Sequence, residues 1–200
     1  MSGTVALTYD DGPDPFWTDL LLAELRQHGA CATFFVTTPR AVLAPDLIEQ
    51  MLADGHEVAL HCMRHIRHSE LSESGLAAEL RTALRQLGSV GVAPRAWRAP
   101  WGVETGATRR LAGRHGLRLW GWNLDSHDWR GDSAAAMQAA LVAQGGLRDG
   151  DVLLMHDALG PGARRTGCEE TMALTRRLLA EAGRLGLECV PISEADGVLA

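Results

Sequence analysis

The chain has few of the features that mark secreted, membrane-bound or nucleic-acid-binding proteins. Its four cysteines are scattered and form no CxxC pair, which is typical of reduced thiols rather than of a disulfide scaffold. No signal-peptide pattern precedes the first predicted strand, and no run approaches the roughly 18 apolar residues of a membrane span. We therefore expect a cytoplasmic protein that has no membrane partner.

The charge balance also argues against a polyanionic partner. Lys and Arg total 19 against 25 Asp and Glu, which gives a formal net charge of −6 and no general attraction to phosphate backbones. With 200 residues and 46% hydrophobic content, the chain can bury the core of one compact domain. We expect a single catalytic domain over residues 1–200 that binds no nucleic acid. No oligomeric state is predicted.

Segments of strand length alternate with helical patterns along the chain. The predicted strands lie near residues 5–10, 32–37, 57–61, 96–100, 118–125, 152–156 and 188–192. Predicted helices lie near residues 14–28, 45–54, 72–88, 105–115, 133–144 and 169–185. This alternation indicates a parallel α/β sheet of about seven strands, either open or closed into a barrel. Either form gathers reactive residues beyond the carboxyl ends of its strands.

Polar clusters follow five of these strands. They read TYDDGP at 8–13, HCMRH at 61–65, RAPWG at 98–102, DSHDW at 125–129 and LLMHD at 153–157. Scattered surface residues would not sort themselves in this way. The five clusters therefore predict an enzyme active site at one rim of the sheet.

The first two clusters indicate a metal centre. Adjacent carboxylates at Asp10 and Asp11 point in different directions, so one can bind a cation while the other accepts a proton. Histidines four apart, such as His61 and His65, meet on one side of a helical turn and can share a metal ion. With Asp11 they would form a catalytic set, for which zinc is favoured and cobalt, nickel or manganese are alternatives. Taken alone, Asp-Gly turns and histidine pairs are also common structural features.

The remaining clusters supply groups that act on charge and substrate. Arg98 can hold a neighbouring carboxylate in its ionised form, and Trp101 offers an apolar wall and a backbone N–H. A hydrogen bond from His156 to the carboxylate of Asp128 would keep the imidazole protonated and ready to donate a proton. His127 and Asp157 are competitors for this pair, with solvated loop positions as the alternative interpretation. Predicted substrate contacts come from Pro100, Trp101, Trp129 and Leu154.

With these motifs in order, the chain resembles the polysaccharide deacetylases of the NodB homology domain, carbohydrate esterase family 4. The resemblance covers residues 5–192. It implies a distorted (β/α) barrel with fewer than eight units and a metal held by Asp11, His61 and His65. It implies that Asp10 is the base and His156 the acid. The remaining implied roles are that Arg98 orients Asp10, Trp101 N–H binds the oxyanion, and Asp128 tunes His156.

The expected reaction is removal of an N-acetyl group from an acetylated sugar or small acetylated metabolite. Hydrolysis of a cyclic amide, an imide or an O-acetyl ester is the alternative on the same scaffold. A non-catalytic carbohydrate-binding module and an aspartyl phosphotransfer domain are alternatives from other classes. Four departures from the family pattern, at Tyr9, Cys62, Arg64 and Trp101, bear on the substrate more than on the chemistry. The segment 157–167 is expected to form a mobile rim loop.

Overall fold

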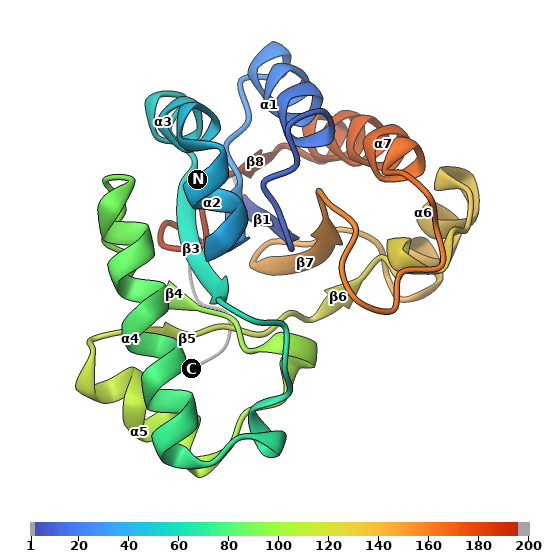
Figure 1. Cartoon of the computed structure of the whole chain (residues 1–200). Coiled ribbons are helices and arrows are strands. Elements are labelled where there is room, and N and C mark those ends of the chain that lie inside the picture. The colour runs from blue at the N-terminus through green and yellow to red at the C-terminus, as the bar shows by residue number, and fades with distance from the viewer. Residues whose placement is uncertain (1–2, 196–200) are drawn as a thin grey trace.

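The computed structural model describes residues 3–195, which form a parallel sheet curled into an incomplete barrel with helices around it (Figure 1). The strands are β1 (Gly3–Asp10), β2 (Thr33–Thr37), β3 (Glu57–Cys62), β4 (Ala96–Trp97), β5 (Arg118–Leu119), β6 (Leu124–Asp125), β7 (Asp151–His156) and β8 (Leu187–Cys189). Their order is β5-β4-β3-β2-β1-β7-β6, with β8 paired to the beginning of β1. The expected distorted barrel is confirmed.

The predicted strand at 118–125 is the main difference in the sheet. It is divided into β5, which pairs with β4, and β6, which pairs with β7 at the other end of the strand order. Within residues 3–195, β5 and β6 are not paired with each other. The segment from Trp120 to Asn123 therefore crosses an opening in the barrel wall, where a ladder of hydrogen bonds would otherwise close it.

Alternation along the strands separates an outer core from an inner one. Val5, Leu7 and Tyr9 of β1 pack in the large cluster beneath the helices, whereas Ala6 packs inside the barrel. The inner cluster consists of Ala6, Phe35, Ala59, Ala96, Trp120, Val152 and Ile192. It is small because several of its positions are occupied by alanine. The barrel is thus filled below its mouth, and a polar residue two positions beyond an inner one faces the mouth.

The helices are α1 (Trp17–Gln27), α2 (Thr38–Leu43), α3 (Pro45–Ala53), α4 (Glu73–Ser89), α5 (Gly106–Arg114), α6 (Ala134–Ala143) and α7 (Glu169–Leu185). Side chains of Ser72, Thr105 and Ser133 accept backbone N–H groups at the starts of α4, α5 and α6, which explains why these boundaries were predictable. The short α2 was not predicted. No helix within residues 3–195 is both long enough and apolar enough to cross a membrane.

Candidate active site

Polar side chains from four strands meet at the mouth of the barrel. Asp10, His61, Arg98 and His156 each lie two or four residues beyond an inward-facing residue of β1, β3, β4 or β7, and so in the same phase of the alternation. All four are buried or nearly so, with side-chain exposures of 5%, 2%, 16% and 0% for Asp10, His61, His156 and Arg98. Strand alternation therefore brings the predicted residues together as expected.

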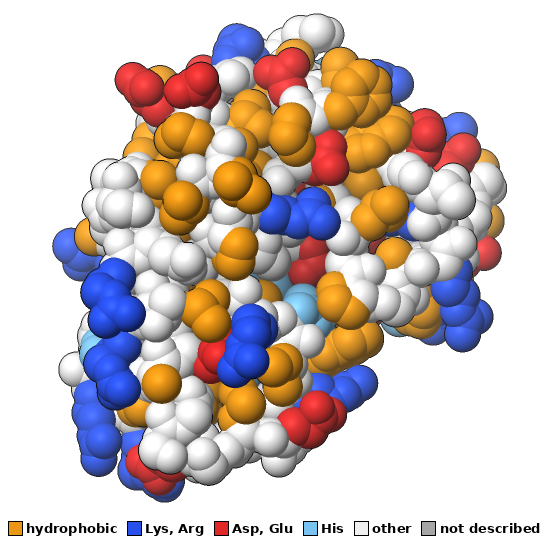
Figure 2. All heavy atoms as spheres, in the orientation of Figure 1, with side chains coloured by type: hydrophobic (Ala, Val, Ile, Leu, Met, Phe, Trp, Pro, Cys, Tyr) orange, Lys and Arg blue, Asp and Glu red, His pale blue; other side chains and the backbone are white. Residues whose placement is uncertain are grey.

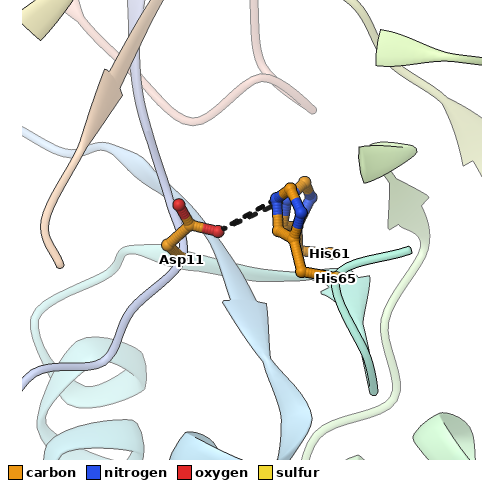
Figure 3. Close-up of side chains that lie close together, drawn as sticks. All are labelled: Asp11, His61 and His65. Carbon is orange, nitrogen blue, oxygen red and sulfur yellow. Dashed lines mark ion pairs between the residues drawn. The ribbon is translucent and has the colours of Figure 1, made fainter. Parts of the chain in front are cut away.

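Asp11, His61 and His65 form a compact cluster beside this mouth (Figure 3). Asp11 Oδ1 lies 3.6 Å from His61 Nε2 and 3.4 Å from His65 Nε2. One donor atom from each residue falls within 4.8 Å of the others, so the three can share one ion. The spacing of the two histidines predicted a helical turn, but they do not lie on one. His61 ends β3 and His65 lies in the irregular segment after it.

The residues of this cluster fit a divalent metal ion. Asp11 Oδ1 is buried without a hydrogen-bond partner, a costly state for a carboxylate oxygen that an ion would relieve. His61 Nδ1 lies 2.9 Å from the carbonyl oxygen of Arg98, an acceptor that fixes the proton on Nδ1 and leaves Nε2 as the ligand atom. Burial lowers the pKa of His61 to about 3, so its imidazole is neutral, as coordination requires.

Backbone conformation places the carboxylate of Asp11. Within residues 3–195, the residues other than glycine with positive φ are Asp11 (77°), Trp101 (60°) and His127 (53°), and each follows the carboxyl end of a strand, β1, β4 or β6. Such conformations cost about 1–3 kcal/mol and gather at functional sites. Regular alternation would send Asp11 to the outer face, opposite Asp10. The left-handed turn carries it to the histidines instead, and periodicity alone could not predict this.

Arg98 holds the second carboxylate of the pair. Its Nη1 donates to Asp10 Oδ1 at 2.8 Å and to Thr8 Oγ1 at 2.8 Å. The guanidinium lies 3.9 Å from the centre of the Phe35 ring, inside the barrel. This cation is fully buried and bonded to Asp10, which is the contact that its predicted role of orienting that carboxylate requires.

The same guanidinium also binds the segment that crosses the barrel opening. Nη2 donates to the carbonyl oxygen of Gly121 at 2.9 Å and Nε to that of Trp120 at 3.4 Å. Arg98 therefore contacts β1 through Thr8 and Asp10, and the crossing segment through two carbonyl groups. Its position is fixed from both sides.

Asp128 and His156 form the predicted pair, supported by two residues that sequence reasoning missed. His156 Nδ1 lies 2.7 Å from Asp128 Oδ1. Asp128 Oδ2 accepts the backbone N–H of His156 at 2.9 Å, Thr171 Oγ1 at 2.7 Å and Arg165 Nη1 at 2.9 Å. Neither Arg165, in a loop, nor Thr171, on α7, follows a strand, so the strand-end pattern gave no signal for them.

Electrostatics make this pair an ion pair. Burial alone would raise the pKa of Asp128, but His156, Arg165 and Thr171 together lower it to about 2. Burial alone would lower the pKa of His156, but the charge and hydrogen bond of Asp128 outweigh it and raise the pKa to about 9. His156 is therefore protonated at neutral pH and can donate a proton.

A cavity of about 220 Å³ opens over these groups. Figure 2 shows histidine and acidic side chains in the hollow, bordered by hydrophobic and basic ones. Trp101, Trp129 and Leu154 line it, as predicted, and Trp122 joins them. Pro100 is buried and lies outside this lining, where it begins the turn that orients Trp101. The cavity thus has an aromatic wall and a charged floor.

The two competing residues lie apart from the Asp128–His156 pair. His127 interacts with Asp125, its Nδ1 lying 3.2 Å from Asp125 Oδ2, and its side chain is 36% exposed. Asp157 is 2% exposed, so its interpretation as a solvated loop residue is wrong. Burial raises the pKa of Asp157 to about 7. Its hydrogen-bond partners are the backbone N–H of Gly12 and the hydroxyl of Thr18.

The loop at 157–167 is tied to the site at several points. Arg165 Nη2 donates to the carbonyl oxygens of His156 and Ala158, and Arg40 donates to that of Leu159. Gly160 packs directly on the Asp11 carboxylate, where an added Cβ would lie 1.8 Å from Oδ2. The loop thus packs against the cluster of Asp11, His61 and His65, and two arginines bind its backbone.

The chain is similar in sequence to several known proteins. A family model described as polysaccharide deacetylase matches residues 2–120. A chitooligosaccharide deacetylase of Bradyrhizobium sp. (strain ANU 289) is 34% identical over 97% of this chain and 92% of its own length. A peptidoglycan-N-acetylglucosamine deacetylase of Bacillus cereus is 32% identical over 95% and 86%.

A solved structure extends the comparison to the fold. The family 4 carbohydrate esterase from Streptomyces lividans, in complex with acetate, superimposes with a TM-score of 0.84 at 29% identity, covering 98% of this chain and 97% of that one. The family model matches more than half of the chain, and the two relatives match nearly all of it. The chain belongs to the polysaccharide deacetylase family, carbohydrate esterase family 4.

Proposed function

We propose that this chain is a metal-dependent deacetylase that hydrolyses the N-acetyl group of an acetylated amino sugar. The observation that carries the proposal is the buried cluster of Asp11, His61 and His65 beside an independent carboxylate, Asp10. The reaction type is supported by the two relatives, which are a chitooligosaccharide deacetylase and a peptidoglycan-N-acetylglucosamine deacetylase.

Asp11, His61 and His65 would hold the metal through one oxygen and two nitrogens. When bound, a zinc ion at such a site polarises a carbonyl group and lowers the pKa of a coordinated water toward about 7. We propose zinc because imidazole ligands favour it, with cobalt, nickel and manganese as alternatives for the same donor set.

Asp10 acts as the general base in this proposal. Arg98 occupies its Oδ1, so we assign Oδ2 to the proton that the attacking water loses. The ion pair with Arg98 gives the buried Asp10 carboxylate a fixed partner. Asp10 is thus held as an acceptor without serving as a ligand.

His156 acts as the general acid. Asp128 binds its Nδ1, which leaves Nε2 as the nitrogen that donates to the leaving amine. An amine leaves poorly until it is protonated, so this step matters for amides above all. The backbone N–H of Trp101, in its left-handed turn at the cavity, is assigned to the developing oxyanion.

The test is a metal-reconstituted assay for released acetate. Substrates should include N-acetylglucosamine, its short oligomers, peptidoglycan fragments, an activated acetate ester and a cyclic imide. We expect release from at least one N-acetylated sugar, abolished by a chelator and restored by zinc. Turnover of the ester or imide alone would favour the alternative hydrolases, and sugar binding without any turnover would favour a binding module.

The substrate is proposed to be a small acetylated sugar in the cytoplasm rather than a crosslinked wall polymer. Support comes from the modest cavity of about 220 Å³ and its wall of Trp101, Trp122 and Trp129, which suits one sugar ring. Comparing kcat/KM for monomer, oligomer and peptidoglycan fragments decides this point. A clear preference for the polymer would overturn it.

A further inference from the structure

Asp157 is a buried carboxylate that the proposed reaction does not use. It directly follows His156 but is turned away from Asp128 and toward the first turn of the chain after β1. Among the contacts of the described residues it accepts the N–H of Gly12 at 3.1 Å and the hydroxyl of Thr18 at 2.6 Å. An isolated buried carboxylate costs several kcal/mol, so its place beside the Asp11–Gly12 turn calls for a function.

The partners of Asp157 define what it holds. The peptide unit between Asp11 and Gly12 is bonded at both ends: its N–H donates to Asp157 Oδ1, and its carbonyl oxygen accepts Thr37 Oγ1 at 3.3 Å. This peptide follows the left-handed φ of 77° at Asp11. Because a residue other than glycine is strained in that backbone conformation, the peptide needs fixed hydrogen-bond partners to keep it.

Two further contacts make the arrangement rigid. Thr18 accepts the backbone N–H of Asp14 at 2.7 Å while donating to Asp157, so the carboxylate is linked to the start of α1. A Cβ added at Gly12 would lie 2.0 Å from Asp157 Oδ2, which shows how closely the turn packs on this carboxylate. A glycine at position 12 is therefore what allows the turn to lie this close to Asp157.

We propose that Asp157 is the positioning residue of the metal centre, which fixes the Asp11–Gly12 peptide and thereby aims the Asp11 carboxylate at His61 and His65. The inference rests on the proposed function, since it takes the Asp11 cluster as the metal site. Residues that orient metal ligands without contacting the metal typically contribute 10–100-fold to metal affinity. Asp157 does this through the backbone of the ligand rather than through its side chain.

The test measures zinc affinity by competition with a chromophoric chelator, independently of turnover. Asp157→Ala should lose about tenfold or more in affinity, whereas Asp157→Asn, which keeps an oxygen for the Gly12 N–H, should lose less. The zinc affinity of Thr18→Val should lie between the affinities of the two Asp157 variants and that of the parent. Zinc at saturating concentration should restore much of the turnover of Asp157→Asn, because its acid and base are intact.

The matched control is Asp151→Asn. Asp151 is a buried carboxylate at the other end of β7, where it accepts Asn123 Nδ2 and the N–H of Arg148. Its replacement should leave zinc affinity unchanged. Unchanged affinity in folded Asp157→Ala, or an equal loss in Asp151→Asn, overturns the inference; if Asp157→Ala does not fold, Asp157→Asn and Thr18→Val decide it. Failure of the parent to bind zinc overturns the proposed function instead.

Discussion

Asp10 and Asp11 are adjacent in the chain but belong to different parts of the site. Asp10 continues the alternation of β1 and meets Arg98, whereas Asp11 turns to the two histidines. The first placement follows from strand geometry, so sequence could predict it. The second depends on a left-handed turn, whose Gly12 N–H donates to Asp157 and whose Asp11 carbonyl oxygen accepts from Thr37, and no local pattern of residue types encodes these contacts.

Replacing Asp10 should separate metal binding from catalysis. Asp10→Asn keeps the shape of the side chain and leaves the three metal ligands untouched, but it removes the proton acceptor. Turnover should fall by at least about 100-fold with zinc affinity within a few fold of the parent. Acetate release and chelator competition measure the two quantities. Near-parental rates in the purified, zinc-loaded variant would show that the base is another group.

His156 should give the reaction a pH limit and a substrate dependence. Since Asp128 raises the pKa of His156 above its ordinary value, to about 9, the acid is present at neutral pH and is lost as pH rises through about 9. Asp128→Asn should move this alkaline limb of the kcat profile to lower pH. An unmoved limb would exclude His156 as its source.

The same acid should matter less when the leaving group needs no proton. His156→Ala is expected to reduce hydrolysis of the N-acetyl sugar by about 100-fold or more, and that of an activated acetate ester much less. Parallel assays on one preparation give the ratio directly. Equal losses on both substrates would contradict the acid role.

At the scale of elements, capping residues and alternation predicted the main helices and strands, including α4, α5 and α6, whose first turns are capped by Ser72, Thr105 and Ser133. The errors arose where tertiary contacts decide the structure. The segment 118–125 has the length of one strand, yet its two ends pair with different neighbours. The loop at 157–167 reads as flexible from its Gly, Pro and Arg content, but Arg40 and Arg165 bind its backbone.

This loop should be sensitive to one methyl group. In Gly160→Ala the new Cβ would lie 1.8 Å from Asp11 Oδ2, so either the loop or the carboxylate must move. We expect zinc affinity to fall by about tenfold or more. Gly88→Ala in α4 is the control, because a Cβ there meets nothing within 4 Å. Equal zinc affinities of the two variants would show that the loop does not constrain Asp11.

At the scale of the molecule, the metal centre sits on a barrel that has its own core. The outer and inner hydrophobic clusters do not include the three ligands, so the fold should persist without the ion. Chelation should abolish acetate release but leave a cooperative unfolding transition at lower temperature. Zinc at 100 times its Kd should stabilise the protein by about 2.7 kcal/mol. Calorimetry with and without chelator measures this, and a noncooperative metal-free protein would contradict it.

The opening between β5 and β6 has a consequence for Arg98. In the described chain, no strand pairs across this opening. The carbonyl groups of Trp120 and Gly121 instead accept hydrogen bonds from the Arg98 guanidinium, which also donates to Asp10. Loss of a partner for a buried carbonyl costs about 1–3 kcal/mol, so substitutions of Arg98 weaken the wall together with the reaction. A strand that sealed the gap would compete for the two carbonyl groups that bind this cation.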